Sequence, residues 1–379
     1  MNPRFPLVAK AHVVVTDAAR YLPEIARHLE GHGARISMHE AATVLDFDFS
    51  RGVMQPDVGG LLLHAEAGDS SLLQEIKMEL VEHVSEFTGI APSEIVWHGD
   101  ASDTGTPPNF RLMRVVDTQR ITPHMQRVRL AGKNLLRFSG NGNLHCKLLI
   151  PRDGFAPEWP FLDTQGSFRW GAGAGRPIVR KYTIRSIDVE SGTLDIDMVI
   201  HADGGPGSEW AKSARPGDTV GMVGPGGRGI GNAQWYLLAG DETALPAIAR
   251  ILESLPPQSH GVALIEVENI AEQQAIHAPA GFRIEWLHRN GAEPGTTSLL
   301  IDAVRATKMP DDPASIFVWC GCEYAAFKEI RAYMRKECGI PPSQHLIASY
   351  WRRGVSEEGK NGLNISTALL QTAAKLVRG

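Results

Sequence analysis

Residues 235–255, WYLLAGDETALPAIARILESL, decide the fold of the second half of the chain. The apolar run 235–240 predicts a strand buried on both faces, and residues 244–255 predict a helix directly after it. Further strands are expected at 262–267, 283–287, 316–320 and 346–350, with helices at 297–306 and 324–338. Alternating buried strands and helices predict a parallel sheet covered on both faces, which binds its ligand at the carboxyl ends of its strands.

Upstream, residues 111–232 have a different pattern, in which short apolar runs alternate with Gly and Pro. Only residues 208–213 favour a helix. The runs at 128–130, 147–150, 181–185, 194–200 and 219–223 therefore predict a closed antiparallel barrel. Residues 224–229, GPGGRG, satisfy G-x-G-x-x-G, but a strand rather than a helix follows them. We interpret this stretch as a turn that leaves the barrel, because a dinucleotide fingerprint needs a helix there.

The first hundred residues predict a small α+β unit, and residues 101–110, DASDTGTPPN, predict a linker. Seven of the fourteen histidines lie in this unit, and His28 and His32 have the i,i+4 spacing of helical metal ligands. Gly31 and Gly33 should end that helix, so surface histidines are the better interpretation. Strands are expected at 11–15, 45–49 and 61–65, and helices after Asp17, at about 70–87 and at 366–377.

The composition excludes several classes of protein. The 379 residues include 38 Lys+Arg and 43 Asp+Glu, a net charge of −5, which argues against a nucleic-acid partner. Four cysteines are too few for a disulfide framework or a four-cysteine zinc site, so redox chemistry would need a bound cofactor. No apolar run approaches the roughly 18 residues of a membrane span, and the N-terminus lacks a signal-peptide core. We therefore expect a cytoplasmic protein with no membrane partner.

Residues 180–185, RKYTIR, carry the most specific motif. On a strand, Arg180 and Tyr182 share one face, and Lys181 and Thr183 share the other. An aromatic ring beside a guanidinium and a hydroxyl suits a planar, phosphate-bearing cofactor, because the ring can stack and the guanidinium can pair phosphate bidentately. A structural cross-strand cluster explains the same residues equally well.

Two further segments place polar groups at helix starts. The Gly-rich turn in GGPGSEWA, residues 204–211, would present backbone N–H groups near Gly207 and Ser208 to an anion. Asp241 and Thr243 directly follow the strand 235–240, at the edge where a parallel sheet holds its ligand. Ordinary helix capping is the alternative in both segments.

Together these segments resemble the siderophore-interacting protein family of flavin-dependent ferric-siderophore reductases. The resemblance covers about residues 111–358 and includes TPHMQRVRL, HCKLLIP, DIDMVIH and YWRRG, which begin at Thr122, His145, Asp195 and Tyr350. It implies a ferredoxin-reductase-like, multidomain fold. The implied parts are a small α+β domain of unknown role (1–100), a linker (101–110), an FAD-binding antiparallel β-barrel (111–232), an NAD(P)H-binding α/β parallel-sheet domain (233–358) and a helical tail (359–379).

The resemblance also implies roles for individual residues. It assigns FAD to Arg180, Tyr182, Thr183, His201, Gly207 and Ser208, with Asp241 and Thr243 facing the flavin from the nucleotide domain. Gly205 to Gly207 departs from the family, which often has Gly-Pro-Ala there. Electrons would pass from NADH or NADPH through FAD to Fe(III) in a siderophore, and the Fe(II) formed is held more weakly by oxygen-rich chelators. Because the flavin carries the chemistry, neither a catalytic side chain nor a metal-ligand set is expected.

The remaining site candidates surround the flavin. Ferric siderophores are often anionic, so a basic rim would steer them. Its candidates are Lys147, Lys181, Arg185, Arg352 and Arg353, each of which could instead be a solvated surface charge. Cys320, Tyr350 and Trp351 are expected to face the nucleotide. Alternatively, Cys320 and Cys322 are buried small apolar residues, and Tyr350 and Trp351 close the core.

Two other functional hypotheses stay open. A general flavin reductase or electron-transfer flavoprotein would carry the same cofactor motifs without siderophore specificity. The second hypothesis is a non-enzymatic module in which the first hundred residues sequester iron or a small molecule. The residues do not identify the siderophore, choose between NADH, NADPH and a ferredoxin-type donor, or fix the oligomeric state, for which a monomer or weak oligomer is expected.

Overall fold

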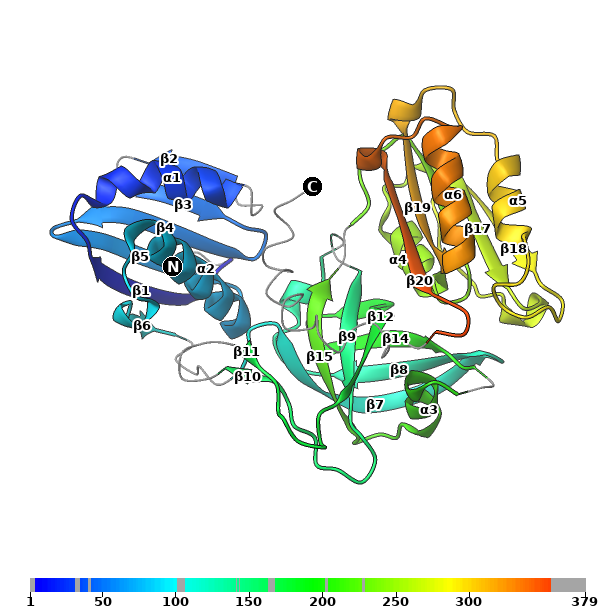
Figure 1. The fold of residues 1–379 in the computed structure, drawn as a ribbon, viewed down its shortest axis with the longest axis horizontal. Helices are drawn as coiled ribbons and strands as arrows, with labels where there is room; N and C mark the ends of the chain where they lie inside the picture. The colour runs from blue at the N-terminus through cyan, green and yellow to red at the C-terminus, as the bar shows by residue number, and fades with distance from the viewer. Residues whose placement is uncertain are drawn as a thin grey trace.

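The computed structural model describes residues 4–30, 35–39, 42–100, 106–140, 142, 144–162, 168–201, 204–226 and 229–355. Within the described residues, three large sheets follow one another along the chain, and each forms a separate body in Figure 1. The predicted helix at 366–377 and residues His32, Gly31 and Gly33 lie outside the described residues. No helix within the described ranges is both long and apolar enough to span a bilayer.

The N-terminal body is a six-stranded antiparallel sheet in the order β2-β3-β4-β5-β1-β6, with two helices packed on one face. Asp69 starts the longer helix by accepting hydrogen bonds from the backbone N–H groups of Ser71 and Leu72. The strands are β1 (Leu7–Val14), β2 (Arg35–His39), β3 (Ala42–Asp46), β4 (Ser50–Asp57), β5 (Gly60–Ala67) and β6 (Trp97–Gly99), and the helices are α1 (Ala18–Glu30) and α2 (Ser70–Thr88). Strands β2, β4 and β6 escaped the sequence prediction, because Gly52 and Pro56 interrupt the apolar alternation of β4 and the other two carry little of it. The strand predicted at 45–49 is wrong over residues 47–49, because β3 ends at Asp46 and these residues form the turn to β4.

The second body is a seven-stranded antiparallel sheet in the order β12-β9-β15-β7-β8-β14-β13. The sheet curls around a shared apolar interior, and the N–H of Arg185, just past β12, donates to the carbonyl of Asp195 in β14 at 2.8 Å. This closure confirms the predicted antiparallel barrel architecture. Its elements are β7 (Phe110–Thr122), β8 (Met125–Ala131), β9 (His145–Ile150), β12 (Ile178–Thr183), β13 (Ser186–Asp188), β14 (Thr193–Val199), β15 (Thr219–Gly226) and α3 (Pro206–Ser213), with the small hairpin β10 (Phe161–Leu162) and β11 (Phe168–Arg169) beside them.

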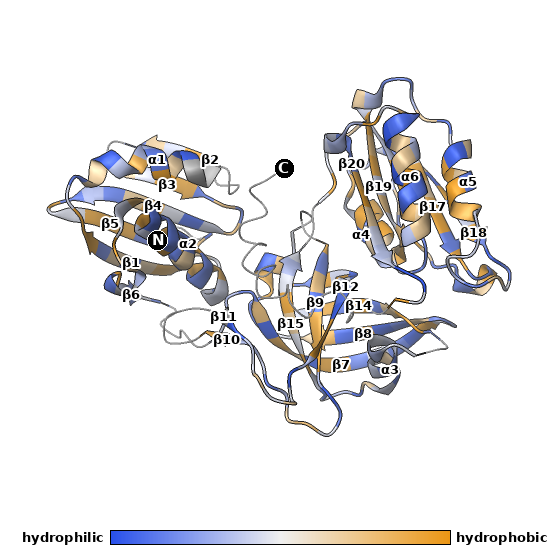
Figure 2. Cartoon of the chain, viewed as in Figure 1, coloured by the Kyte–Doolittle hydropathy of each residue, from blue (hydrophilic) through white to orange (hydrophobic). Residues whose placement is uncertain are grey.

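The third body is a five-stranded parallel sheet in the order β18-β17-β16-β19-β20. Helix α4 packs on one face and helices α5 and α6 on the other, as the sequence predicts. Figure 2 shows apolar residues along the central strands, whereas α5 and α6 each carry polar and apolar residues. The elements are β16 (Trp235–Gly240), α4 (Leu245–Ser254), β17 (His260–Val267), β18 (Gly281–His288), α5 (Leu299–Ala306), β19 (Ile316–Glu323), α6 (Tyr324–Lys336) and β20 (His345–Trp351).

A buried arginine joins the barrel to the parallel sheet. The Arg250 guanidinium, on α4, donates to the carbonyl of Ile184 at 2.9 Å, and to those of Phe138 and Gly140 at 3.3 and 3.2 Å. Beside it, Arg185 forms a bidentate pair with Glu253, at 2.7 and 2.6 Å. A charge buried among carbonyls from another body holds the two bodies in one relative position.

We expect Arg250→Ala to lower the free energy of unfolding by roughly 2–4 kcal/mol, because it leaves buried carbonyls without a donor. Scanning calorimetry on the flavin-free protein measures this loss. Arg283→Ala is the control, since Arg283 is 66% exposed and pairs only with its neighbour Glu285. Its expected change is within about 0.5 kcal/mol. Equal effects of the two substitutions would contradict the bridging role.

The N-terminal sheet contacts the barrel through the start of α2. Arg137 pairs with Glu75 at 2.7 Å, and the Asn134 amide donates to the Ser70 hydroxyl at 2.8 Å. The contact lies on the side of the barrel that carries residues 134–137. The first hundred residues therefore contact the barrel at residues 134–137.

Candidate functional site

Strand β12 carries the three residues that the sequence assigns to the flavin. Arg180 and Tyr182 are half-buried, and Thr183 is buried. A side chain at Gly207 would overlap the Tyr182 hydroxyl, so the first turn of α3 lies directly against this ring. The structure therefore brings the arginine-tyrosine strand and the Gly-rich turn together, although more than twenty residues separate them.

The start of α3 suits an anion. Gly205 occupies the N-cap position, and no side chain within the described residues caps the helix. The Ser208 hydroxyl instead accepts a hydrogen bond from the backbone N–H of His201 at 3.0 Å. An uncapped helix start beside Arg180 and Tyr182 offers backbone donors, a guanidinium and a ring to one ligand, and these groups fit a phosphate-bearing flavin.

Two lysines stand directly opposite each other on this part of the barrel. Lys181 of β12 is the register partner of Lys147 of β9, and Thr183 is likewise the partner of His145. Like charges directly opposite on neighbouring strands repel each other, and an anion bound between them would relieve that repulsion. Burial and the two lysine charges lower the pKa of His145 to about 4, which leaves this imidazole neutral at pH 7.

Asp241 organises the carboxyl edge of the parallel sheet. Its carboxylate accepts hydrogen bonds from the N–H and hydroxyl of Thr243, at 3.0 and 2.5 Å. It also accepts from the backbone N–H of Glu323, at 3.1 Å, and the indole of Trp351, at 2.8 Å. Asp241 thus ties the end of β16 to the ends of β19 and β20, and Thr243 and Trp351 are turned toward it.

We expect Asp241 to make stability depend on pH. Burial and the neighbouring Glu242 raise its pKa to about 7, while hydrogen bonds from Thr243 and Trp351 act in the opposite direction. Between about pH 4 and pH 7 the folded carboxyl then holds a proton that the unfolded chain releases, so this contribution to stability is lost as the pH rises, by at most about 1.4 kcal/mol per pH unit.

Urea unfolding at a series of pH values tests this expectation. Asp241→Asn removes the titrating group, so the fall in stability between pH 4 and pH 7 should shrink relative to the wild type. Glu329→Gln, at an exposed carboxyl on α6, is the control and should leave the profile unchanged. An unaltered profile in Asp241→Asn would show that another group titrates.

Tyr350 connects this edge to β12 (Ile178–Thr183), which is called the flavin strand from here on. Burial raises the pKa of the Tyr350 phenol above its ordinary value, and the neighbouring Thr183 side chain acts in the opposite direction. The ring also lies over Gly321, where a side chain would overlap it, and meets Trp319 edge-on at 6.0 Å. The carboxyl edge of the parallel sheet therefore faces the strand that carries Arg180 and Tyr182.

A cavity of about 280 Å³ lies at the same edge, lined by the ends of β16, β17 and β19 and the starts of α5 and α6. Cys322 lines it, whereas Cys320 is fully buried in the core against α5 and α6. The two sulfur atoms are 3.7 Å apart. Sequence reasoning chose Cys320 as the nucleotide-facing residue. Cys320 and Cys322 share one face of β19, and it is Cys322 that lines the cavity, because it lies nearer the carboxyl end of the strand.

The other three predicted basic residues have different surroundings. Arg185 is committed to Glu253 and lies between the barrel and the parallel sheet, with only 12% of its side chain exposed. The Arg352 guanidinium lies over the Tyr324 ring at 4.8 Å, and the Arg353 backbone donates to Glu323 at 3.2 Å. Only Lys147 and Lys181 are brought together on the flavin strand and its neighbour.

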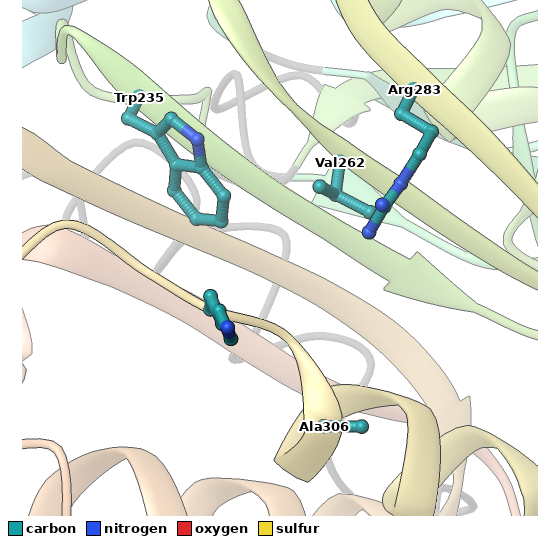
Figure 3. Close-up of a pocket in the computed structure, with 5 residues that line it drawn as sticks. Trp235, Val262, Arg283 and Ala306 are labelled. Atoms are coloured by element: carbon teal, nitrogen blue, oxygen red, sulfur yellow. The ribbon is translucent and has the colours of Figure 1, made fainter.

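A second cavity, of about 460 Å³, opens at the opposite edge of the parallel sheet (Figure 3). Trp235, Val262 and Arg283 lie at the amino ends of β16, β17 and β18, and Ala306 ends α5. Lys308 completes the lining. Because ligands of parallel sheets bind at the carboxyl ends, this cavity is separate from the site built around Asp241.

Three further groups meet across the boundary between the barrel and the parallel sheet. The His124 imidazole lies 2.8 Å from the Glu268 carboxylate and 2.9 Å from that of Glu272. Thr122 donates to Glu272 at 2.6 Å. This cluster escaped the sequence analysis, because nearly 150 residues separate its two halves, and in the structure it acts as a second bridge between the two bodies.

Three family models match the chain along its length. Residues 10–98 match an "Uncharacterized protein conserved in bacteria" family, and residues 114–229 match the "Siderophore-interacting FAD-binding domain". Residues 233–354 match the "Siderophore-interacting protein" model. The two models that name a function thus cover the barrel and the parallel sheet.

Individual proteins match the same region. The chain is 32% identical over 264 residues to the ferric vibriobactin reductase ViuB of Vibrio cholerae, spanning 65% of this chain and 91% of the relative. It is 32% identical over 253 residues to the NADPH-dependent ferric-chelate reductase of Escherichia coli, spanning 64% and 92%. A crystal structure of a siderophore utilization protein from T. fusca superimposes with a TM-score of 0.54 at 38% identity, covering 65% of this chain and 94% of that one.

Proposed function

Because the chain belongs to the siderophore-interacting protein family, we propose that it is an FAD-dependent reductase that passes electrons from NADH or NADPH to Fe(III) in a siderophore. The contact between Thr183 and Tyr350 carries this proposal, because it sets the carboxyl edge of the parallel sheet against the flavin strand. A nucleotide at that edge and a flavin on β12 would then be neighbours. The names of both reductase relatives agree with this chemistry.

Each proposed residue has a physical task. When bound, FAD supplies the change from two-electron to one-electron transfer that ferric iron requires. Arg180 would pair its phosphate, the Tyr182 ring would pack against it, and the uncapped start of α3 at Gly207 and Ser208 would face the pyrophosphate. Thr183 would present its hydroxyl at the edge of the ring system.

Lys147 and Lys181 would attract the substrate. An anionic ferric chelate reaching the flavin strand would meet both ammonium groups, which lie opposite each other on β9 and β12. Their mutual repulsion falls when the anion binds, so the energy lost by placing them together would be regained in the complex. Electron transfer needs the chelate to approach the flavin, and the iron needs no ligand from the protein.

The proposal includes a domain organisation and a compartment. Residues 111–232 would hold FAD and residues 233–358 would receive the nucleotide. The reaction would take place in the cytoplasm, where NADH and NADPH are regenerated, with the protein as a monomer or weak oligomer. Residues 1–100 contact the barrel at Asn134 and Arg137, and the proposed reaction assigns them no role.

An anaerobic titration tests the proposed function without a nucleotide. The FAD-loaded full chain is photoreduced and mixed with a ferric siderophore, and a chromogenic chelator traps Fe(II). About two Fe(II) per flavin reoxidised are expected, because FAD carries two electrons and Fe(III) accepts one. If free flavins but not ferric chelates reoxidise the protein, it is a general flavin reductase. A protein that does not take up FAD would overturn the assignment of β12.

A further inference from the structure

We propose that the chain selects NADH over NADPH, because carboxylates line the nucleotide edge and sequester the arginine that follows β18. This inference rests on the proposed function, in which the carboxyl edge of the parallel sheet receives the nucleotide. It goes beyond the family match, and it differs from the donor in the name of the NADPH-dependent relative. The two nucleotides differ only by the phosphate on the adenosine ribose, so the question is which charges that phosphate would meet.

The orientation of the nucleotide follows from the sheet order. The reactive end must lie near the flavin strand, and Tyr350 of β20 contacts that strand through Thr183. The strands run in the order β18-β17-β16-β19-β20, so the adenosine end extends toward β17 and β18. Two strand spacings from β16 to β18 span about 10 Å, enough to separate the two ends of a dinucleotide. The ribose phosphate of NADPH would therefore lie near the ends of β17 and β18.

Arg289 is the basic residue near the ends of β17 and β18, and its guanidinium is already paired with carboxylates. It directly follows β18, and its side chain is 3% exposed. The guanidinium forms a bidentate pair with Glu242, at 2.7 and 2.8 Å. It also lies 3.5 Å from Glu266. Two carboxylates thus occupy the guanidinium N–H groups that would otherwise bind a phosphate.

The cavity at this edge, which shares Glu266 with the Arg289 cluster, is acidic. Of its charged lining residues, Asp241, Glu266, Asp302, Glu323 and Glu329 are acids, and Arg305 is the only base, paired with Glu329 at 3.7 Å. Glu266 also accepts hydrogen bonds from Thr297 and from the backbone of Leu300, so its carboxylate occupies the start of α5. A carboxylate suits the ribose hydroxyl of NADH, which can donate to it, and repels a phosphate in the same position.

The other basic residues near the cavity lie at the wrong edge for this phosphate. Arg352 and Arg353 follow β20, at the side that faces the flavin strand. Arg352 stacks on Tyr324 at the start of α6. A phosphate on the adenosine ribose would be three strands away from them, so these arginines do not offset the acids near β17 and β18.

Calorimetric titration of the FAD-loaded full chain with NAD⁺ and with NADP⁺ tests the inference without turnover. NAD⁺ is expected to bind at least about 10-fold more tightly than NADP⁺. Flavin bleaching under anaerobic conditions should show the same order for NADH and NADPH. Equal or tighter binding of NADP⁺ would overturn the inference. Failure of both nucleotides to bind would also overturn it. If the photoreduced protein then still reduced the ferric siderophore, the proposed reductase function would be unaffected.

Glu242→Gln locates the origin of the selectivity. The glutamine keeps the shape of the side chain but removes the negative charge that pairs with Arg289. The preference for NAD⁺ should therefore fall about 10-fold, mainly through tighter NADP⁺ binding. Glu266→Gln should act in the same direction and guards against a folding defect in the first variant. Asp46→Asn removes a similar carboxylate, paired with Arg51 at 2.7 Å in the N-terminal sheet, and should leave the preference unchanged. An unchanged preference in both glutamine variants would overturn the role of these carboxylates.

Discussion

Replacing Arg180 with alanine is expected to raise the dissociation constant for FAD about 100-fold. A guanidinium that pairs a phosphate bidentately makes charge-assisted hydrogen bonds worth roughly 1.5–3 kcal/mol each, and a 100-fold change corresponds to about 2.7 kcal/mol. Arg180 lies on β12 beside Tyr182, and its guanidinium donates to the carbonyl of Val179 at 2.9 Å. Quenching of FAD fluorescence on titration with flavin-free protein measures the constant.

Two companion variants separate a phosphate contact from a loss of fold. Arg180→Lys keeps the charge but not the bidentate geometry, so an intermediate loss of about 10-fold is expected. Arg114→Ala removes an exposed arginine from β7 of the same barrel and should leave FAD binding unchanged. If Arg180→Ala changed the dissociation constant less than about 3-fold, RKYTIR would be a structural cluster rather than a cofactor site.

Removing Lys147 and Lys181 together should lower kcat/KM for an anionic ferric siderophore by about 10- to 30-fold at low ionic strength. Long-range attraction between the lysine pair and the chelate speeds association, and salt screens it over a Debye length of about 10 Å at 0.1 M. The double alanine variant should therefore also lose most of the salt dependence of kcat/KM. Steady-state rates over a range of NaCl concentrations measure both effects.

The control for this pair removes two positive charges from the opposite end of the parallel sheet. The double variant Arg283→Ala and Lys308→Ala removes both basic residues from the lining of the cavity in Figure 3. It should leave kcat/KM for the ferric siderophore unchanged. A loss of activity with unchanged salt dependence would argue that the lysines act by packing rather than by charge.

The parallel sheet shows how much local pattern determines. Every strand predicted between residues 235 and 350 is present. The central strands β16, β17 and β19 carry the continuous apolar runs that strands buried on both faces need. The N-terminal sheet was less predictable. Strand β4 contains Gly52 and Pro56, and β2 is held by its register with β3, so cross-strand pairing rather than sequence alternation creates both.

For the candidate site, the sequence by itself determined which segments matter, and the tertiary structure decided what each side chain can do. The RKYTIR strand and the Gly-rich turn are visible as motifs, since their chemistry lies within a few consecutive residues. Register decided that Lys147 faces Lys181, and packing decided that Arg185 pairs with Glu253. The pairing of Arg289 with Glu242 has the same origin. Whether a charged side chain forms an ion pair depends on partners that lie tens of residues away in the sequence. Local periodicity carries no information about such partners.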